Sequence, residues 1–594
     1  MNRLSRTFLV IALGVSLQTA AADDAPHNVI LFVPDGLRAP LVDASTAPAM
    51  ARLRDEGVNF RNSHALFPTL TTANASAFAT GHLLGDTGDW ANTIYTGLPF
   101  QGSVTPFLEN DAVLRELNMH LGGSYLHEPT IFAAAAESQR ISAALIGKLG
   151  PAAIFDPTAM RGTDTLIIDD TTGQPGKGLQ ISEAWQKAIE AAKLKQVNAP
   201  SRGDNSRSGT FVANLAQQQY FLEMTLKVVL PRFKQLGRPF LLVYWSRDPD
   251  GTQHTQGDGG INGPTSLTAL RAADGSLAAI EQTLKLLGLY DSTNIIIAAD
   301  HGFSTIAKDS ENGTRELPVG FLALDLANAL RKQDASLQLF DPDDDNKVID
   351  LATGHPSLAN GVIAADARQP QVVVAANGGS DLIYLPDARR ARALGQRVVR
   401  ALLEKDYVSG VFVDEQSLGK MDGALGLTDI GLVGHAITPR PAIVVSFRSY
   451  LSNPCAQSEP LLCAREISDH TYPIGGGMHG SFSRADTWNF MAARGPDFRV
   501  RHVDELPASN ADIGMTMAKL LGLSLVPKGK LAGRVLVESL RGHESDPLPR
   551  VEQRRLESRP AASGLKTVLQ TQSFGGNTYY DVGGFPGRTA GLAQ

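Results

Sequence analysis

The stretch Asn28-Val-Ile-Leu-Phe-Val-Pro-Asp35 decides the fold, because it is a short apolar run that ends on a carboxylate. Two later runs share this form: Pro239–Trp245, which is followed by Asp250 and His254, and Asn294–Ala299, which leads directly into Asp300-His301. Continuous apolar runs of this length are typical of strands buried on both faces of a parallel sheet. Ligands of open α/β sheets gather beyond the carboxyl ends of the strands, so we expect these acidic and imidazole side chains to share one edge.

Helical patterns alternate with the apolar runs, which predicts a doubly wound, mostly parallel α/β sheet with helices on both faces. Expected strands are 29–33, 141–146, 240–245, 295–299, 443–447 and 487–493, and expected helices are 47–56, 130–138, 217–233 and 266–287. A small α+β cap is predicted as an insertion at 320–432. It divides the catalytic core into 23–319 and 433–540. The charged and then Gly-rich segment 541–594 is predicted to be a loosely attached tail.

The first 22 residues have the pattern of a cleavable export signal, with Arg3 and Arg6 ahead of a short apolar centre and a small-residue site at Ala20-Ala21-Ala22. An uncleaved anchor is the alternative, and no later stretch of about 20 apolar residues predicts a transmembrane segment. We therefore expect a periplasmic or secreted protein. In that oxidising compartment Cys455 and Cys463 are expected to form a disulfide.

Charge and ligand chemistry narrow the expected function. A formal charge of −7 gives no electrostatic footprint for binding a nucleic-acid duplex. Carboxylates and imidazoles hold cations such as Zn²⁺, and two cations about 4 Å apart can clamp a phosphoryl group. The sequence is therefore interpreted as encoding a site for two Zn²⁺ ions that acts on a small phosphate ester, with other divalent metals as alternatives. The candidate ligands are Asp35, Thr71, Asp250, His254, Asp300, His301 and His479.

The Thr-rich turn Pro68-Thr-Leu-Thr71-Thr-Ala-Asn74 opens a segment that is predicted to be helical to about Thr80. Free N–H groups at a helix N-terminus favour an alkoxide and a transferred anion, and a metal could activate the Thr71 hydroxyl as a nucleophile. A helix-capping role is the alternative for Thr71. Asn74 returns to the same helical face and could donate a hydrogen bond to a phosphoryl oxygen.

Three further features leave alternatives open. Lys148 ends another apolar run near the same edge, where it could contact the substrate or remain a solvated surface lysine. Trp90 and Tyr95, in an insertion at 88–128, could stack on a nucleobase or aryl group, or could simply pack in the core. The acidic run 341–345 could bind Ca²⁺, although the closing Glu of an EF-hand is missing, which favours a surface turn.

Five motifs occur in the order seen in the alkaline phosphatase superfamily, and they are most similar to its nucleotide pyrophosphatase/phosphodiesterase branch. They are Val-Pro-Asp35-Gly, Pro-Thr-Leu-Thr71-Thr-Ala-Asn74, Asp250-Gly-Thr-Gln-His254, Asp300-His301-Gly and Met-His479-Gly. The likeness spans roughly residues 28–305 and 470–525. The branch usually has Phe-Pro between Thr and Asn and a His after the Asn, where this chain has Thr72-Ala73 and Ala75. These departures keep the spacing but change the pocket of the leaving group.

The resemblance implies a division of roles. Asp250, His254 and His479 would hold one zinc, and Asp35, Thr71, Asp300 and His301 the other. Thr71 would attack phosphorus and form a phospho-threonine intermediate, while Asn74 steadies a non-bridging oxygen. Lys148 is similar to an anion-contacting lysine of related sulfatases and phosphatases, which favours an alkaline phosphomonoesterase as the alternative activity. An inactive, metal-free binding module is a further alternative of a different class.

Overall fold

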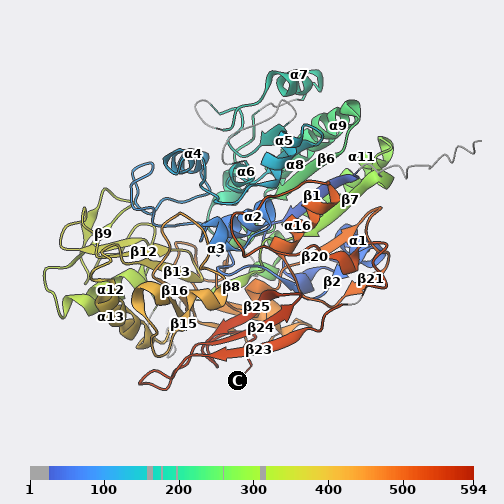
Figure 1. The fold of residues 1–594 in the computed structure, drawn as a ribbon. Coiled ribbons are helices and arrows are strands. Elements are labelled where there is room, and N and C mark those ends of the chain that lie inside the picture. Colours follow the sequence, from blue (N-terminus) through green and yellow to red (C-terminus); the bar gives the residue numbers. More distant parts are fainter. Residues whose placement is uncertain are drawn as a thin grey trace, which may run out of the picture.

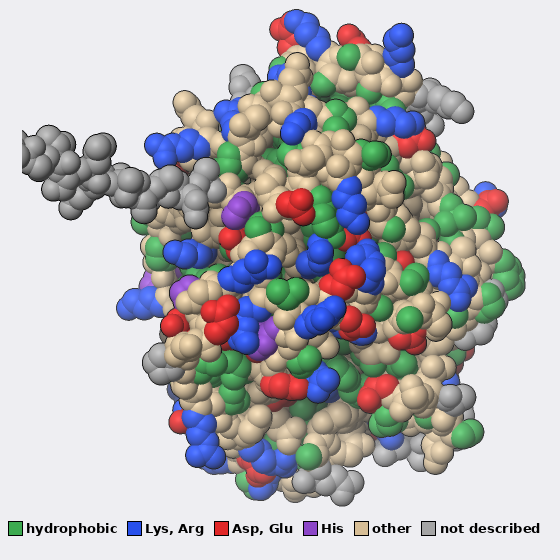
Figure 2. Space-filling model, turned by 90° about the vertical axis from the view of Figure 1, so that its right-hand side faces the viewer, with side chains coloured by type: hydrophobic (Ala, Val, Ile, Leu, Met, Phe, Trp, Pro, Cys, Tyr) green, Lys and Arg blue, Asp and Glu red, His purple; other side chains and the backbone are tan. Residues whose placement is uncertain are grey.

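The computed structural model describes residues 26–156, 165–174, 178–194, 198–257, 260–307, 316–455, 457–546 and 548–593. The predicted signal segment at 1–22 lies outside the described residues. Among the described residues, none of the helices combines the length and the apolar character needed to cross a membrane. On the face shown in Figure 2, Lys and Arg side chains are interspersed with Asp and Glu.

An eight-stranded sheet forms the centre of the molecule, in the order β21-β2-β20-β7-β1-β6-β4-β5. Its strands are β1 (Asn28–Pro34), β2 (Val58–Phe60), β4 (Ser142–Gly147), β5 (Thr165–Ile168), β6 (Phe240–Ser246), β7 (Thr293–Ala298), β20 (Met491–Arg494) and β21 (His502–Asp504). Strand β1 pairs in parallel with both β6 and β7, and β4 pairs in parallel with β5 and β6. Strand β20 joins antiparallel to β7, so the sheet is mostly parallel, as predicted.

The alternation of side chains along β1 explains why helices cover both faces. Val29, Leu31 and Val33 enter one buried cluster, and Ile30 and Phe32 enter the other. One face packs against α2 (Thr71–Thr80), α5 (Ile131–Ser138), α6 (Pro151–Phe155) and α16 (Asn510–Leu520). The other packs against α1 (Pro48–Glu56), α8 (Leu215–Met224), α9 (Leu230–Leu236) and α11 (Pro264–Leu286). This doubly wound arrangement, visible in Figure 1, confirms the mostly parallel sheet with helices on both faces that the sequence predicted.

A second eight-stranded sheet, largely antiparallel, forms the additional α+β unit, in the order β10-β9-β11-β12-β13-β16-β14-β15. Its elements are β9 (Gln338–Asp341), β10 (Lys347–Ile349), β11 (Gly361–Ala364), β12 (Val372–Ala376), β13 (Ser380–Tyr384), β14 (Val408–Val413), β15 (Leu425–Gly426), β16 (Ile443–Phe447), α12 (Phe321–Arg331) and α13 (Ala391–Leu403). The strand expected at 443–447 for the catalytic core is β16, which pairs with β13 and β14 in this second sheet instead. Val373 and Leu382 on one face of the sheet join the same core cluster as β1.

The segment expected to be a loose tail is an ordered sheet made of β23 (Glu552–Glu557), β24 (Val568–Phe574) and β25 (Asn577–Gly584). Leu569 and Tyr580 are buried in the main core, and Asp581 lies 2.8 Å from His64 Nε2. The prediction was wrong because it rested on charge and Gly content. It overlooked the apolar residues of β24 and β25, among them Val568, Leu569 and Tyr579, whose side chains are buried.

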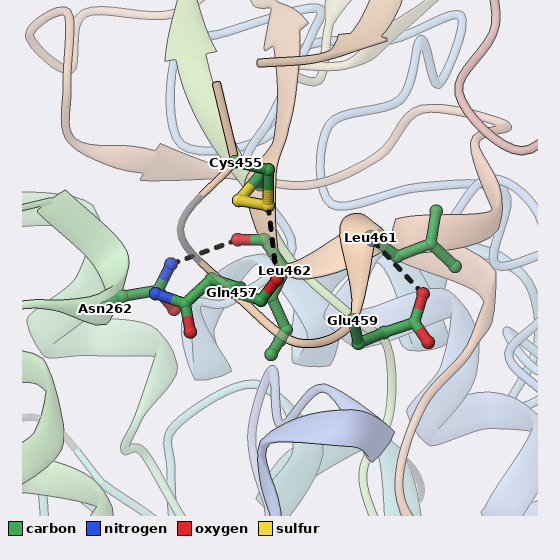
Figure 3. Close-up of a disulfide and its surroundings, with 7 residues drawn as sticks. Asn262, Cys455, Gln457, Glu459, Leu461 and Leu462 are labelled. Atoms are coloured by element: carbon green, nitrogen blue, oxygen red, sulfur yellow. Dashed lines mark hydrogen bonds between the residues drawn. A yellow bond between two sulfur atoms is a disulfide. The ribbon is translucent and has the colours of Figure 1, made fainter. Parts of the chain in front are cut away.

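Cys455 and Cys463 form the predicted disulfide, with 5.8 Å between their Cα atoms. The bridge closes a surface loop after β17 (Ser449–Leu451), and Figure 3 shows Asn262 donating to the carbonyl oxygen of Leu462 in that loop. Strand β18 (Ala464–Ile467) leaves the loop and pairs with β8 (Ser304–Ala307), which in turn pairs with β19 (Gly477–Met478). This small sheet brings the chain to His479 beside the central strands.

Candidate active site

The carboxyl ends of β1, β6 and β7 meet at one edge and bring the predicted ligands together. Asp35 follows β1, α10 (Asp250–Thr255) begins shortly after β6, and Asp300 is the second residue after β7. Backbone contacts hold this edge: the Asp250 N–H donates to the Asp35 carbonyl oxygen at 3.1 Å. Asp300 Oδ1 accepts from the Gly36 N–H at 3.0 Å. The sheet edge itself therefore fixes the carboxylates.

The six acidic and imidazole residues form one buried group, which we call the catalytic cluster: Asp35, Asp250, His254, Asp300, His301 and His479. Ligand atoms of Asp35, Asp300 and His301 lie within 4.8 Å of one another, and so do those of Asp250, His301 and His479. His254 Nε2 is 3.1 Å from Asp250 Oδ1. Because His301 belongs to both groups of three, the two halves of the predicted site are adjacent.

The hydrogen bonds of the three imidazoles leave their Nε2 atoms facing carboxylates. Each Nδ1 contacts a backbone carbonyl oxygen: His254 reaches Gly477 at 2.7 Å, His479 reaches Thr69 at 2.8 Å and His301 reaches Gly302 at 2.9 Å. A carbonyl oxygen can only accept a hydrogen bond, so each Nδ1 carries a hydrogen, and in a neutral ring the Nε2 then presents a lone pair. Burial lowers the pKa of His301 to about 3 and that of His479 to about 4, so both rings are neutral at pH 7.

The opposing carboxylate oxygens are also acceptors without donors. Asp35 Oδ1, Asp250 Oδ1 and Asp300 Oδ2 are buried and make no hydrogen bond. Burial raises the pKa of Asp300 to about 6, and burial together with Asp300 raises the pKa of Asp35 well above its ordinary value. These imidazole nitrogens lie 3.1–3.7 Å from carboxylate oxygens, and a cation bound between them would satisfy both sets of acceptors. The residues present therefore fit a metal centre with mixed nitrogen and oxygen ligands.

Thr71 is the first residue of α2, and its hydroxyl points into the catalytic cluster. The cap position is Leu70, which is extended and makes no side-chain cap, so Thr71 does not serve as the cap. Its Oγ1 lies 3.4 Å from His301 Nε2 and accepts a hydrogen bond from Lys148 Nζ at 3.2 Å. The hydroxyl thus lies at a helix N-terminus, next to a candidate metal-binding imidazole and an ammonium group.

Asn74 lies apart from the cavity, contrary to the expected contact with a phosphoryl oxygen. Its Oδ1 accepts from the N–H of Leu66 and from Asn510 Nδ2, and its Nδ2 donates to the carbonyls of Leu66 and Leu70. Both donor hydrogens are used, which leaves none for a ligand. Asn74 instead stabilises the loop from Leu66 to Leu70, which precedes Thr71.

Asn92 occupies the place that was expected for Asn74. It lines the cavity beside Thr71, and its Oδ1 accepts from the Thr72 N–H at 2.9 Å, which leaves its Nδ2 as a donor for a ligand. Asn92 lies in the insertion after α2, where no periodic pattern marks it. Its neighbours Asp89 and Thr93 are also polar, so the sequence offers no signal that singles Asn92 out.

Lys148 is buried at the site and is not a solvated surface residue. Its Nζ lies 3.0 Å from Asp35 Oδ2, 3.3 Å from Asp250 Oδ2 and 3.1 Å from Glu109 Oε1. Burial alone would lower the pKa of Lys148, but the neighbouring carboxylates outweigh burial and raise it well above its ordinary value. Lys148 is therefore charged at neutral pH.

A cavity of about 330 Å³ opens from Thr71 toward the second sheet. One wall is formed by residues at the carboxyl edge of the central sheet, and another by residues of the second sheet. The lining includes Phe107, Arg202, Arg247, Asp343, Asn360, Asn377 and Tyr472, none of which the sequence had singled out for this site. The acidic run 341–345 forms the turn between β9 and β10, and its Asp343 accepts hydrogen bonds from Ser103 and Asn360. The additional unit thus completes the wall of the cavity.

The two aromatic candidates pack within the protein. The Trp90 side chain is buried, and its Nε1 donates to the Pro439 carbonyl oxygen at 2.9 Å. The Tyr95 ring lies 5.4 Å from the ring of Tyr384, centroid to centroid. Neither residue lines the cavity, so their stacking on a ligand is not supported.

A second buried group of potential ligands, the His82 cluster, consists of His82, Asp86 and Glu128. Its carboxylates are engaged by backbone donors: Asp86 accepts from the N–H groups of Leu531 and His435, and Glu128 accepts from those of Lys528 and Gly529. His82 Nδ1 lies 3.0 Å from Asp86 Oδ2 and its Nε2 lies 3.7 Å from Glu128 Oε2. The cluster thus links four segments of the chain, at residues 82–86, 128, 435 and 528–531.

The central sheet with its acidic and imidazole edge defines an alkaline-phosphatase-like protein. A solved structure of murine ectonucleotide pyrophosphatase/phosphodiesterase 5, an inactive threonine-to-alanine form in complex with AMP, superposes with a TM-score of 0.51. The match covers 84% of this chain and 96% of that chain at 14% sequence identity, which shows a shared fold.

The family is identified by sequence. The model of the type I phosphodiesterase/nucleotide pyrophosphatase family matches residues 29–348, and the chain belongs to this family, which is metal-dependent. Venom phosphodiesterases 2 and 1 of Crotalus adamanteus are each 24% identical over 283 residues, or 47% of this chain. The matched region covers 27% and 26% of those proteins, so the chain spans about a quarter of the length of these relatives.

Proposed function

We propose that this protein is an exported, metal-dependent phosphoric ester hydrolase that cleaves phosphodiester or pyrophosphate bonds of nucleotide-type substrates. The observation that carries the proposal is the position of the Thr71 hydroxyl, 3.4 Å from His301 Nε2 at the N-terminus of α2. Family membership supports the reaction class. The structural neighbour adds support, since its inactive form is a threonine-to-alanine substitution and it binds AMP.

Two Zn²⁺ ions are the proposed cofactor. Asp250, His254 and His479 would hold one ion, and Asp35, Asp300, His301 and the Thr71 oxygen would hold the other. The pair would supply Lewis-acid stabilisation of the phosphoryl oxygens and would lower the pKa of the Thr71 hydroxyl. The unpaired oxygens of Asp35, Asp250 and Asp300 support this assignment.

The chain's own groups account for the remaining steps. Thr71 Oγ1 gives its proton to solvent and forms a bond to phosphorus as the bond to the leaving oxygen breaks, which gives a phospho-threonine and a leaving group that takes up a proton from solvent. The positive end of the α2 dipole, the Asn92 amide and the Lys148 ammonium are placed to stabilise the charge on the phosphoryl oxygens. Water then attacks phosphorus, the bond between phosphorus and Thr71 Oγ1 breaks, and a proton of that water returns to the Thr71 oxygen.

A second candidate activity, alkaline phosphomonoester hydrolysis by the same site, is favoured by Lys148. Its Nζ is 3.2 Å from Thr71 Oγ1, which places a positive charge next to the oxygen that would bond to phosphorus. A monoester carries one more negative charge than a diester at neutral to alkaline pH, so this contact favours monoesters. The ratio of activities on mono- and bis-aryl phosphates separates the two candidates.

Export rests on the signal-like segment 1–22 and on the disulfide. Cys455 and Cys463 are bonded, as is typical of proteins that fold in an oxidising compartment such as the periplasm. Fractionation of the native host with an antibody tests the location. Recovery of the unprocessed chain in the cytoplasm would contradict it.

The test of the nucleophile is Thr71→Ala. We expect turnover of a bis-aryl phosphate and of nucleotide diesters to fall by at least about a thousandfold, because the attacking oxygen is gone. Metal content should stay near the wild-type value, since the carboxylates and imidazoles remain. Wild-type turnover in this variant would refute the assignment, and Thr72→Ala, one residue away, serves as the matched control.

A further inference from the structure

Glu109 is the cavity residue whose role the proposed reaction leaves open. Its side chain is nearly buried, and its Oε1 lies 3.1 Å from Lys148 Nζ. It lines the same cavity as Thr71 and Lys148. Lys148 also donates to Thr71 Oγ1, so Glu109 contacts the ammonium that touches the proposed nucleophile.

The backbone holds Glu109 rigidly in this place. On one side, the buried Leu108 donates its N–H to the Asn92 carbonyl oxygen at 2.7 Å. On the other side, Asn110 caps α4 (Asp111–His120) by accepting from the N–H groups of Ala112 and Val113. Glu109 therefore lies between two anchored residues, and its orientation toward Lys148 is built into the loop.

Gly150 permits the close approach of this loop. It has a φ of +91°, and a Cβ at this position would lie 2.8–3.0 Å from the Cγ, Cα and Cβ atoms of Glu109. Any other residue would push the Glu109 backbone away from Lys148. The loop at Glu109 and the turn at Gly150 thus together place the Glu109 carboxylate beside the Lys148 ammonium.

The charges at Lys148 show what the pair does. Three carboxylates surround its Nζ, from Asp35, Asp250 and Glu109. Asp35 and Asp250 are proposed metal ligands, so bound cations would balance their charge. Arg247, a further basic group near Glu109, is paired with Asp170. Glu109 then remains as the counter-charge of Lys148, and the ammonium offers a hydrogen bond to the phosphoryl group with little net positive charge.

We propose that Glu109 is a specificity-determining residue that neutralises Lys148 and biases the site toward the monoanionic phosphoryl groups of diesters over the dianionic groups of monoesters. This inference rests on the proposed function, because it concerns the substrate class of the same site. A substrate with one more negative charge gains more from an uncompensated ammonium, so removal of the Glu109 charge shifts the preference toward monoesters.

The experiment measures kcat/KM for a mono-aryl and a bis-aryl phosphate, together with inhibition by inorganic phosphate as a measure of binding. Glu109→Gln keeps the shape and removes the charge, so the mono-to-bis ratio should rise about tenfold and phosphate should inhibit more strongly. Glu109→Asp keeps the charge, and its ratio should remain within about twofold of wild type. Glu116→Gln removes a charge from the exposed side of α4 and should leave the ratio unchanged.

The coupling to Lys148 completes the test. In a Lys148→Ala background, Glu109→Gln should no longer change the ratio, because the charge that it neutralises is absent. An unchanged ratio in Glu109→Gln, or the same rise in both backgrounds, would overturn the inference while leaving the hydrolase intact. If the metal-loaded wild-type protein hydrolyses neither ester, the proposed function itself fails, so the two failures are distinguishable.

Discussion

The catalytic cluster and the His82 cluster contain the same kinds of residues but differ in how their acceptors are satisfied. In the His82 cluster, backbone N–H groups donate to both carboxylates. In the catalytic cluster, Asp35 Oδ1, Asp250 Oδ1 and Asp300 Oδ2 are buried without a donor. Both clusters have the composition of a metal site, so composition alone does not distinguish them. The number of unsatisfied acceptors distinguishes the two clusters. Of the two, only the catalytic cluster has buried carboxylate oxygens that need a bound cation as their partner.

The largest expected effect is that of metal removal. Dialysis against a chelator should lower activity on a bis-aryl phosphate by at least about a hundredfold, because the cations supply both Lewis-acid stabilisation and the activated hydroxyl. Added Zn²⁺ should restore the activity. Elemental analysis of the assayed samples measures how much metal each one retains. Full activity with less than about one metal ion per ten chains would break the comparison, because the catalytic cluster would then function without a cation.

A matched pair of histidine variants gives the next largest effect. His254→Ala removes a proposed ligand and should weaken metal binding by at least about tenfold. His82→Ala removes an equally buried imidazole from the other cluster and should leave the metal content per folded chain unchanged. Competition with a chromogenic chelator measures both affinities. Equal losses in the two variants would show that the clusters do not differ in the way proposed.

The central sheet could be predicted from the sequence because each of its main strands is a continuous apolar run. Apolar runs such as 28–33 and 240–245 can only be buried, and the carboxylates after them therefore fall on one edge. The same logic failed for β16, where the apolar run predicted a strand but carried no information about which sheet it joins. It failed again for 541–594, where the burial of β24 depends on distant partners.

The site residues that belong to sequence motifs next to strands and helices could be predicted. Those that reach the cavity from irregular loops could not. Thr71 and the six acidic and imidazole residues follow strands or begin a helix, so their positions could be inferred. Asn92 and Glu109 reach the cavity through an insertion whose path is set by tertiary contacts. Asn74 was assigned to the substrate from helical spacing alone, whereas its amide is fully used by the loop before Thr71.

Asp86→Asn tests whether the His82 cluster is structural. The change removes a buried charge that accepts from two backbone N–H groups and from His82, so the free energy of unfolding should fall by about 2–4 kcal/mol. Urea denaturation measures this loss. Activity per folded molecule and metal content should remain at wild-type values. Asp55→Asn, at an exposed position, is the control and should change stability by less than about 0.5 kcal/mol.

The smallest expected effect is the pH dependence of that stabilisation. Burial alone would raise the pKa of Asp86, but hydrogen bonds from His82 and from backbone N–H groups outweigh burial and lower it to about 2. A carboxyl whose pKa is lower in the folded state stabilises the protein fully above its unfolded pKa, near 4. This contribution is lost as the pH falls through the folded value. The stability difference between wild type and Asp86→Asn should therefore shrink by about 1 kcal/mol between pH 5 and pH 3. A difference that stays constant or widens over this range would mean that Asp86 is not held ionised by its donors, and the contrast between a satisfied and an unsatisfied cluster would lose its basis.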